Sequence, residues 1–293
     1  MSFDAAHCTL CPRQCSADRT NGVGACHCGT EIRIARAALH YWEEPCISGK
    51  DGSGAVFFAG CALGCVFCQN QEISRCAVGK VLTVGQLADA FLRLQEQNAN
   101  NINLVTGSHF TPWIVQALEL TKPKMHIPVV WNCGGYESLE ILHMLDGLVD
   151  IYLPDLKFYT AETAKAYANC PDYFSVASKA ILEMYRQVEA LSWNGDLLER
   201  GLMVRHLVLP GHRKESMQIL DWLADALPKA DFLLSLMGQY TPDEPLSDKH
   251  LNRRIATFEY ESVRKYAVQL GLDGYGQERS SASSSYTPKF WTE

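Results

Sequence analysis

The sequence has no long hydrophobic run and no excess of positive charge. No apolar stretch in its 293 residues approaches the roughly 20 residues that a membrane-spanning helix needs. Its 26 Lys and Arg residues are outnumbered by 33 Asp and Glu, giving a formal net charge of −7, whereas a general nucleic-acid binder normally has a basic surface. These absences argue against a membrane protein and against a nucleic-acid binder, so small molecules and proteins remain as the expected partners.

The start of the sequence also lacks a basic segment followed by an apolar core, so we expect no secretory leader. This absence matters because the chain contains 12 cysteines, which in a secreted protein would suggest disulfides. We therefore expect reduced thiols and a soluble, cytoplasmic protein. With 47% hydrophobic residues, the chain can bury a large core as one barrel-like α/β domain.

Three of the cysteines follow an apolar run in a C-x3-C-x2-C pattern. They are Cys61, Cys65 and Cys68, and Phe67 stands directly before the last of them. A tight loop with three thiolates can hold three irons of a [4Fe–4S] cluster and leave the fourth iron without a protein ligand. That open iron could bind the amino and carboxylate groups of S-adenosylmethionine (SAM). A zinc site or buried structural thiols are the alternatives, but structural zinc usually takes four protein ligands from paired C-x2-C motifs.

A second group of cysteines lies near the start of the chain. The run Cys8-x2-Cys11-Pro-x2-Cys15 is followed by Cys26 and Cys28. Four or five thiols within ~20 residues indicate a metal site in a reduced compartment. Tetrahedral zinc and an auxiliary [4Fe–4S] cluster both fit the pattern, with the same expected ligands. These ligands are Cys8, Cys11, Cys15 and Cys26, while Cys28 is a reserve.

Apolar runs alternate with helical periodicity through the middle of the chain. Strands are expected at 55–59, 102–106, 128–131, 148–153, 202–209 and 232–237, and helices at 84–97, 113–120, 138–145, 161–168, 178–191 and 216–227. Strands that alternate with helices of this length form right-handed βα units around a parallel sheet. We predict three parts, which are a Cys-rich metal-binding head at 1–47, a barrel at 48–243, and a C-terminal helix with a polar tail at 244–293.

The cluster loop resembles that of the radical SAM superfamily, whose motif is C-x3-C-x-aromatic-C after the first strand of a partial barrel. Within it, the chain looks most like the pyruvate formate-lyase activating enzyme-related proteins of unassigned substrate. The similarity extends over residues 7 to 290 and includes Glu43-Glu44-Pro45, Cys68-Gln69-Asn70, Asp150 to Lys157, Arg205 to Gly211 and Met237 to Tyr240. It implies an open (β/α)6 TIM-type partial barrel with its active site at the C-terminal ends of the strands.

The residues after the second and third of these strands are candidate cofactor ligands. Gly107 and His109 stand where related activating enzymes carry a Gly-Gly-Glu type sequence that contacts the SAM amino group. Asn132 replaces an acid that, in those enzymes, helps to hold a monovalent cation beside SAM. His109 could instead be a packed loop residue. The resemblance also implies that aromatic Phe67 belongs to the cofactor site.

The fourth and fifth strands bring charged candidates. Asp155 and Lys157 share one face, where Asp155 can accept hydrogen bonds from the SAM ribose or ammonium and Lys157 can neutralise the SAM carboxylate or the reduced cluster. A structural ion pair is the alternative. Alternation sends Arg205 and His206 to opposite faces. We expect Arg205 to point inward toward a SAM or substrate carboxylate, although the reverse arrangement fits the pattern too.

These features, with the resemblance, predict an oxidoreductase that reductively cleaves SAM to a 5′-deoxyadenosyl radical for hydrogen abstraction. The family implies [4Fe–4S] and SAM as cofactors and a flavodoxin- or ferredoxin-type protein as electron donor. The expected activity is that of a glycyl-radical activating enzyme, which acts on a glycine of a partner protein. The alternative is a radical SAM enzyme that modifies a small metabolite or a peptide.

Overall fold

The chain folds around one large, mostly parallel sheet. The computed structural model describes residues 3–76, 78–242, 245–276 and 290. The strands of these ranges are β1 (Ile32–His40), β2 (Ser53–Phe58), β3 (Lys80–Leu82), β4 (Ile102–Val105), β5 (Val129–Cys133), β6 (Ile151–Pro154), β7 (Ser192–Asn194), β8 (Leu197–Leu207), β9 (Phe232–Met237) and β10 (Gly274–Gly276). Their order across the sheet is β10-β9-β8-β6-β5-β4-β2-β1-β3, with β7 paired to β8 alone.

The six strands predicted from the sequence are neighbours in this sheet and run parallel. They are β2, β4, β5, β6, β8 and β9, and β10 adds a further parallel strand. At the opposite end of the sheet, β1 lies between β2 and β3 and pairs with both in antiparallel orientation. The predicted α/β architecture of an open (β/α)6 sheet is therefore confirmed, since β3 and β10 at the two ends of the order do not pair with each other.

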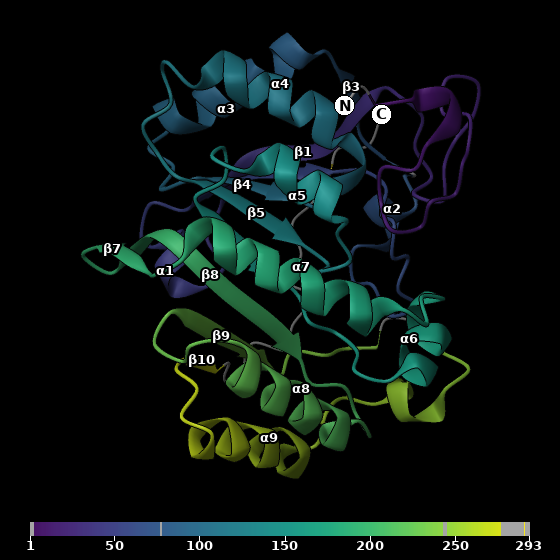
Figure 1. The fold of residues 1–293 in the computed structure, drawn as a ribbon, viewed down its shortest axis with the longest axis vertical. Helices are drawn as coiled ribbons and strands as arrows, with labels where there is room; N and C mark the ends of the chain where they lie inside the picture. The colour runs from purple at the N-terminus through teal and green to yellow at the C-terminus, as the bar shows by residue number, and fades with distance from the viewer. Residues whose placement is uncertain (1–2, 77, 243–244, 277–289, 291–293) are drawn as a thin grey trace.

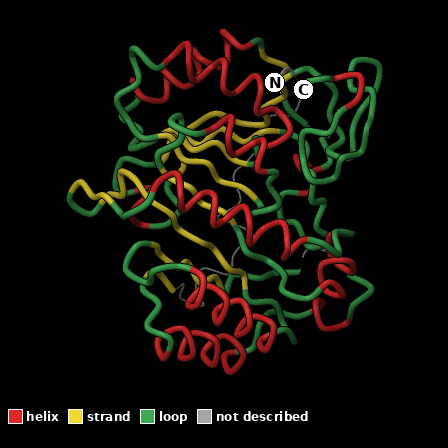
Figure 2. The backbone as a smooth tube through the Cα atoms, in the orientation of Figure 1, coloured by secondary structure: helices red, strands yellow, loops and turns green. Residues whose placement is uncertain are grey.

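Helices cover one face of the sheet (Figure 1; Figure 2). They are α3 (Val84–Glu96), α4 (Thr111–Thr121), α5 (Leu139–Leu145), α7 (Tyr173–Val188), α8 (Arg213–Ala226) and α9 (Thr257–Gln269), while α1 (Pro45–Ser48), α2 (Gln71–Ser74) and α6 (Ala161–Ala168) are shorter. Side chains cap several of these helices at the expected position. Thr83, for example, accepts from the backbone of Gln86 and the Gln86 side chain accepts from Thr83, which is a capping box at the start of α3.

Alternate residues of the strands enter two different cores. Trp131 and Val204 pack with the helices in the larger core, whereas Val130 and Met203 lie on the opposite, inner face. There they form a smaller cluster with Ile47 of α1. The inner face is thus apolar at these positions. The charged residues described in the next subsection lie closer to the carboxyl ends of the same strands.

Four strands were not predicted from the sequence. β1 lies inside the range 1–47 predicted for the head, yet it is a full member of the sheet, and a bulge between Ile34 and Arg36 interrupts its alternation. β3, β7 and β10 each have three residues, too few for a periodic signal. The predicted C-terminal helix corresponds to α9, and the tail at 280–285 lies outside the described residues.

No helix among the described residues is long and apolar enough to cross a membrane. Beyond residue 276 only residue 290 is described. There the ring of Phe290 contacts that of Phe57 edge-on, with 5.6 Å between the centroids. Phe57 belongs to β2 and faces the inner side of the sheet with Ala55.

Candidate cluster and cofactor site

The loop with the three spaced cysteines begins two residues after β2. Its turns use Gly60 and Gly64, whose φ angles of 87° and 59° favour glycine. The backbone N–H of Cys68 donates to the carbonyl of Cys65 at 3.1 Å, which tightens the loop, and the N–H of Leu63 donates to the sulfur of Cys61 at 3.4 Å. We refer to residues 61–68 as the cluster loop.

The thiols of the cluster loop suit a [4Fe–4S] cluster. All three are partly exposed in the loop. Burial of the sulfur raises the pKa of Cys65, and the nearby ammonium of Lys157 acts in the opposite direction. Nowhere in the described part of the chain do three or more His, Cys, Asp or Glu side chains converge as ligands of a single metal ion. An all-thiolate set with an N–H···S bond suits an iron–sulfur cluster.

The N-terminal head docks directly on the cluster loop (Figure 1, purple segment beside α2). The guanidinium of Arg13 donates to the carbonyl of Ala62 at 2.7 Å and to that of Leu63 at 3.1 Å. It also donates to the carbonyls of Ala168 and Asn169, at the C-terminal end of α6. In addition, the N–H of Cys61 donates to the Cys26 carbonyl at 3.2 Å. The Arg13 side chain, which is only partly buried, therefore holds the head, the cluster loop and α6 together.

The four predicted head ligands lie near one another. The sulfurs of Cys15 and Cys26 would each stand 3.5 Å from a Cβ added at Gly24, so Gly24 leaves room between them. Burial, with smaller contributions from nearby Cys26 and Cys8, raises the pKa of the Cys11 thiol to about 12. These positions bring the predicted thiols into one region, although they do not converge on a single ion.

A thiol contact that the sequence did not predict joins the head to the segment after α2. The sulfur atoms of Cys28 and Cys76 lie 3.2 Å apart, although 48 positions separate the two residues. Cys28 also donates to the carbonyl of Ala59, which precedes the cluster loop. Nothing in the local pattern around Cys76 indicates this partner.

Charged residues converge on the inner face of the sheet. Arg205 donates through Nε to Asp155 at 2.8 Å, and Lys157 binds the other oxygen of Asp155. Burial alone would raise the pKa of Asp155, but the charges of Arg205 and Lys157 hold it below its usual value. Lys157 lies near Cys65 as well, and the charges of Asp155 and of that thiolate raise the pKa of its ammonium against the effect of burial.

Two glutamates, an asparagine and a serine complete this group. The remaining nitrogens of Arg205 donate to Glu43 at 3.2 Å and to the Asn132 side chain at 2.7 Å. Burial raises the pKa of Glu43 to about 7, although Arg205 acts against this rise. The hydroxyl of Ser235 donates to Glu44 at 2.7 Å. We call this set the inner polar layer; its members are Glu43, Glu44, Asn132, Asp155, Lys157, Arg205 and Ser235.

Sequence reasoning missed several residues that build the layer. Glu43 and Glu44 lie in a loop before α1 instead of at a strand end, so only their presence in a segment shared with the family could have indicated them. Tyr173 of α7 was also missed. Its hydroxyl accepts from the N–H of Lys157 and contacts the carbonyls of Gly134 and Asp155, which ties two strand ends together.

The two glycines after β5 allow close approach of other segments. A Cβ on Gly134 would stand 2.4 Å from Leu63 of the cluster loop. Gly135 has φ of 77°, and a Cβ there would stand 2.1 Å from the Asp155 carbonyl oxygen. Side chains at these positions would separate the cluster loop from β5 and β5 from β6.

Other predicted residues lie outside the inner polar layer. His206 is on the helix side, where it bonds the Leu156 carbonyl and Ser216 of α8. His109 is 2% exposed beneath the head and bonds the Ala59 carbonyl at 2.7 Å. The space beside Gly107 is filled by Ile114 and Trp131. Phe67 packs against the rings of Phe158, Tyr167 and Tyr240.

Glu137 is a buried carboxyl beside the head. It is 3% exposed; one of its oxygens accepts from Ser108, and the other has no hydrogen-bond partner among the described residues. Burial raises its pKa from 4.5 to about 7, although the nearby Ser108 and Cys133 side chains oppose the shift. The folded protein therefore holds this proton more tightly than the unfolded chain does.

The pKa of Glu137 predicts a loss of stability as the pH rises. From 4.5 to about 7 the folded state binds more protons at Glu137 than the unfolded state, so its contribution to the free energy of unfolding falls with pH. Glu137→Gln is expected to stabilise the protein by about 2–3 kcal/mol more at about pH 8 than at about pH 4. Urea unfolding of this variant and of exposed Glu140→Gln at both pH values measures the difference. An equal effect of Glu137→Gln at the two pH values contradicts the assignment.

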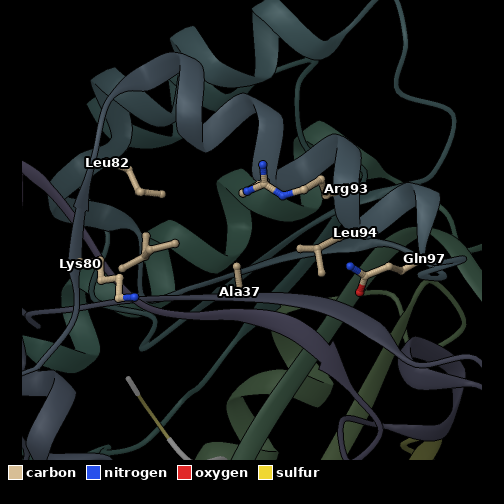
Figure 3. A pocket seen from close by; sticks show the side chains of 8 residues that line it. Ala37, Lys80, Leu82, Arg93, Leu94 and Gln97 are labelled. Atoms are coloured by element: carbon tan, nitrogen blue, oxygen red, sulfur yellow. The ribbon is translucent and has the colours of Figure 1, made fainter. Parts of the chain in front are cut away.

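A separate cavity lies between β1, β3 and α3 (Figure 3). Its volume is about 260 Å³, and its wall is mainly apolar, with Lys80, Arg93 and Gln97 among the lining residues. It shares no residue with the cluster loop or the inner polar layer. We therefore place the candidate site at the strand ends and leave this cavity outside it.

Comparisons with known proteins agree with this location. Residues 47–164, which include the cluster loop, match the 4Fe–4S single cluster domain family. A protein of Methanocaldococcus jannaschii described as uncharacterized is 28% identical over 277 residues, covering 91% of this chain and 76% of the relative.

Two solved structures are similar to this chain. A radical SAM methyltransferase from Sphaerobacter thermophilus aligns with a TM-score of 0.52 and 13% identity, covering 85% of this chain and 77% of the other. A domain of a pyruvate-formate lyase-activating enzyme from Bacteroides vulgatus aligns with a TM-score of 0.39 and 14% identity, covering 67% of this chain and 91% of that domain. The methyltransferase and this chain share a fold.

Proposed function

We infer that this chain is a member of the radical SAM superfamily, and that it binds a [4Fe–4S] cluster through Cys61, Cys65 and Cys68 and cleaves SAM reductively. The observation that carries this proposal is the position of Lys157, whose ammonium lies near Cys65 and binds Asp155 of the inner polar layer. The cluster would supply the electron that converts SAM to methionine and a 5′-deoxyadenosyl radical. A flavodoxin- or ferredoxin-type protein is the proposed electron donor.

The chain's own residues hold and orient the cofactors. Lys157 and Asp155 form a charged pair beside the cluster loop that can bind the carboxylate and ammonium of SAM. Arg205 is a positioning residue, since its guanidinium is bonded to Asp155, Glu43 and Asn132. The N–H of Leu63 points at the Cys61 sulfur, where a hydrogen bond stabilises the thiolate and adjusts the cluster potential.

We propose hydrogen abstraction as the reaction, in the manner of a glycyl-radical activating enzyme. The resemblance in the cluster loop and in the segment from Asp150 to Lys157 supports this proposal. The inner polar layer favours the second candidate, a small metabolite or a peptide as substrate, because one buried oxygen of Glu44 has no hydrogen-bond partner among the described residues. Both candidates require SAM cleavage.

Anaerobic reconstitution with iron and sulfide tests the function. We expect electron paramagnetic resonance of the reduced protein to show one [4Fe–4S] signal from the cluster loop that changes when SAM is added. Chromatography should then detect 5′-deoxyadenosine and methionine in equal amounts. A reconstituted cluster whose spectrum is insensitive to SAM, with no 5′-deoxyadenosine formed, contradicts the proposal.

Asp155→Asn and Lys157→Met are expected to weaken SAM binding without loss of the cluster. Each removes one charge-assisted contact, which corresponds to ~1.5–3 kcal/mol, or on the order of tenfold or more in the dissociation constant. Iron content should stay unchanged because the cluster ligands lie in a different loop. Equilibrium dialysis with labelled SAM measures the affinity, and exposed Lys165→Met is the control. Normal SAM affinity in both variants would make the pair a structural one.

The head is expected to bind its own metal through Cys8, Cys11, Cys15 and Cys26. A variant that lacks the three cluster-loop cysteines isolates this second site. Analysis of its iron, sulfide and zinc distinguishes an auxiliary cluster from zinc. We expect one of the two metals to remain, and to be lost when Cys11 is also replaced by Ala. If the folded protein contains neither metal, the prediction is wrong and the head cysteines are structural thiols.

A further inference from the structure

The inner polar layer contains a carboxylate with one oxygen that no described side chain binds. Glu44 is 8% exposed, one of its oxygens accepts from the Ser235 hydroxyl, and the other, Oε2, has no hydrogen-bond partner among the described residues. Glu43 and Asp155, in contrast, are both ion-paired with Arg205. The nearby charge of Arg205 attracts Glu44, but a buried carboxylate oxygen without a hydrogen bond is still costly, so its retention calls for an explanation.

A second open group lies on the same side of the sheet. Asn103 of β4 is 0% exposed, and both its side-chain oxygen and its side-chain nitrogen lack partners in the described structure. Its neighbours Ile102 and Leu104 pack in the helix-side core, so alternation directs Asn103 to the inner face. Buried polar atoms are normally hydrogen-bonded in proteins. Open atoms on Glu44 and Asn103 therefore point to partners that a ligand supplies.

Glu44 is connected to the cluster loop through a continuous set of contacts. Its partner Ser235 is directly opposite Arg205 in the pairing of β8 with β9. Arg205 binds Asp155, Asp155 binds Lys157, and Lys157 lies near Cys65. A molecule bound at Glu44 would thus occupy the inside of the sheet next to the proposed SAM site.

We propose that Glu44 binds the primary ammonium group of the substrate, carried on an alkyl chain, and that Asn103 bonds a neighbouring polar group of the same molecule. Only one oxygen of Glu44 is open, because Ser235 occupies the other. One acceptor suits an ammonium, whereas a guanidinium fork uses two acceptors side by side. This inference rests on the proposed radical SAM function and names its substrate class. A lysyl side chain in a peptide and a free alkylamine share this chemistry.

Binding of defined probes tests the proposal on reconstituted, full-length protein with SAM present. Ligand-observed NMR titrations compare Nα-acetyl-lysine methylamide and n-hexylamine with Nα-acetyl-norleucine methylamide, which lacks the charge. We expect at least one amine to bind about tenfold or more tightly than the norleucine probe. Tighter binding of the lysine probe indicates a peptide, and tighter binding of hexylamine indicates a free amine. Equal affinity for all three probes would overturn the proposal.

Glu44→Gln is the matched variant and exposed Glu96→Gln its control. Glu44→Gln should lose the preference for the ammonium, whereas Glu96→Gln should keep it. Without probes, Glu44→Gln should unfold at about the wild-type urea midpoint, because it removes the repulsion between Glu44 and Glu43 together with the attraction of Arg205. A lower midpoint, or an ammonium preference that survives in Glu44→Gln, would make Glu44 a structural residue and overturn the inference.

The two proposals fail in different measurements. Formation of 5′-deoxyadenosine by the wild-type protein tests the radical SAM function and does not depend on the role of Glu44. The probe titrations test the ammonium site by binding alone. SAM cleavage together with an absent ammonium preference overturns only the inference, and absence of SAM cleavage overturns the function.

Discussion

Replacing Cys61, Cys65 and Cys68 together with Ala is expected to reduce SAM cleavage to the background level of the assay. These residues are the only thiols of the cluster loop, and each would hold a different iron. Single replacements should have nearly the same effect, because a cluster with two protein ligands lacks a stable attachment. Because the three ligands act as a unit, the losses of activity in the three single variants should add up to far more than the loss in the triple variant.

Iron content and formation of 5′-deoxyadenosine measure this effect. Cys46→Ala is the matched control, because Cys46 is a buried thiol of α1 that packs on the inner apolar cluster. It should keep both the cluster-loop iron and SAM cleavage. The head metal would remain in the triple variant, so the iron that is lost is assigned by difference. Formation of 5′-deoxyadenosine by the triple variant at the wild-type rate would remove the central claim.

Local sequence patterns were sufficient to predict the six parallel strands of the βα units and the position of the cluster loop. The six βα strands have apolar runs of the right length, and the alternation of Arg205 with His206 gives the two faces that the structure shows. β1 was missed because its bulge shifts the pattern. The three-residue strands were missed because they exist through pairing with longer neighbours, which a single window of sequence does not contain.

The contacts of the inner polar layer depend on residues distant in sequence. Arg205 meets Glu43 across 162 positions, and Glu44 meets Ser235 across 191. No spacing rule relates such pairs, because they are formed when the sheet curves and brings the segment before α1 against its inner face. The same holds for Cys28 and Cys76. His109 illustrates the opposite error, since a polar residue after a strand can be directed beneath the head instead of toward the strand-end site.

The inner polar layer explains why the proposed SAM contacts and stability are coupled. Asp155 is bonded to both Arg205 and Lys157, so a ligand that engages Lys157 changes the balance of charge on Asp155. Arg205 remains as its second cationic partner. It also keeps Glu43 and Asn132 in place at the same time. Arg205 is therefore the residue on which the arrangement of the layer depends most.

Arg205→Met is expected to lower the free energy of unfolding by about 3–5 kcal/mol, because it leaves the buried carboxylates of Asp155 and Glu43 without this cation. Arg205→Lys should recover part of the loss, since one ammonium cannot reproduce three bonds in a planar fork. Urea unfolding of the reconstituted protein measures each change. Exposed Arg254→Met, the control, should alter stability by less than about 0.5 kcal/mol.

The double variant Arg205→Met with Asp155→Asn separates this electrostatic cause from a packing defect. If the cost arises from an uncompensated charge on Asp155, neutralising that charge should make the double variant at least about 1 kcal/mol more stable than the sum of the two single effects predicts. Glu43 moderates the loss, because burial already raises its pKa to about 7 and protonation can neutralise it near that pH. The deficit of Arg205→Met should therefore be smaller at about pH 6 than at about pH 8. A deficit that is the same at both pH values, with strictly additive effects in the cycle, would assign the role of Arg205 to packing of its aliphatic stem.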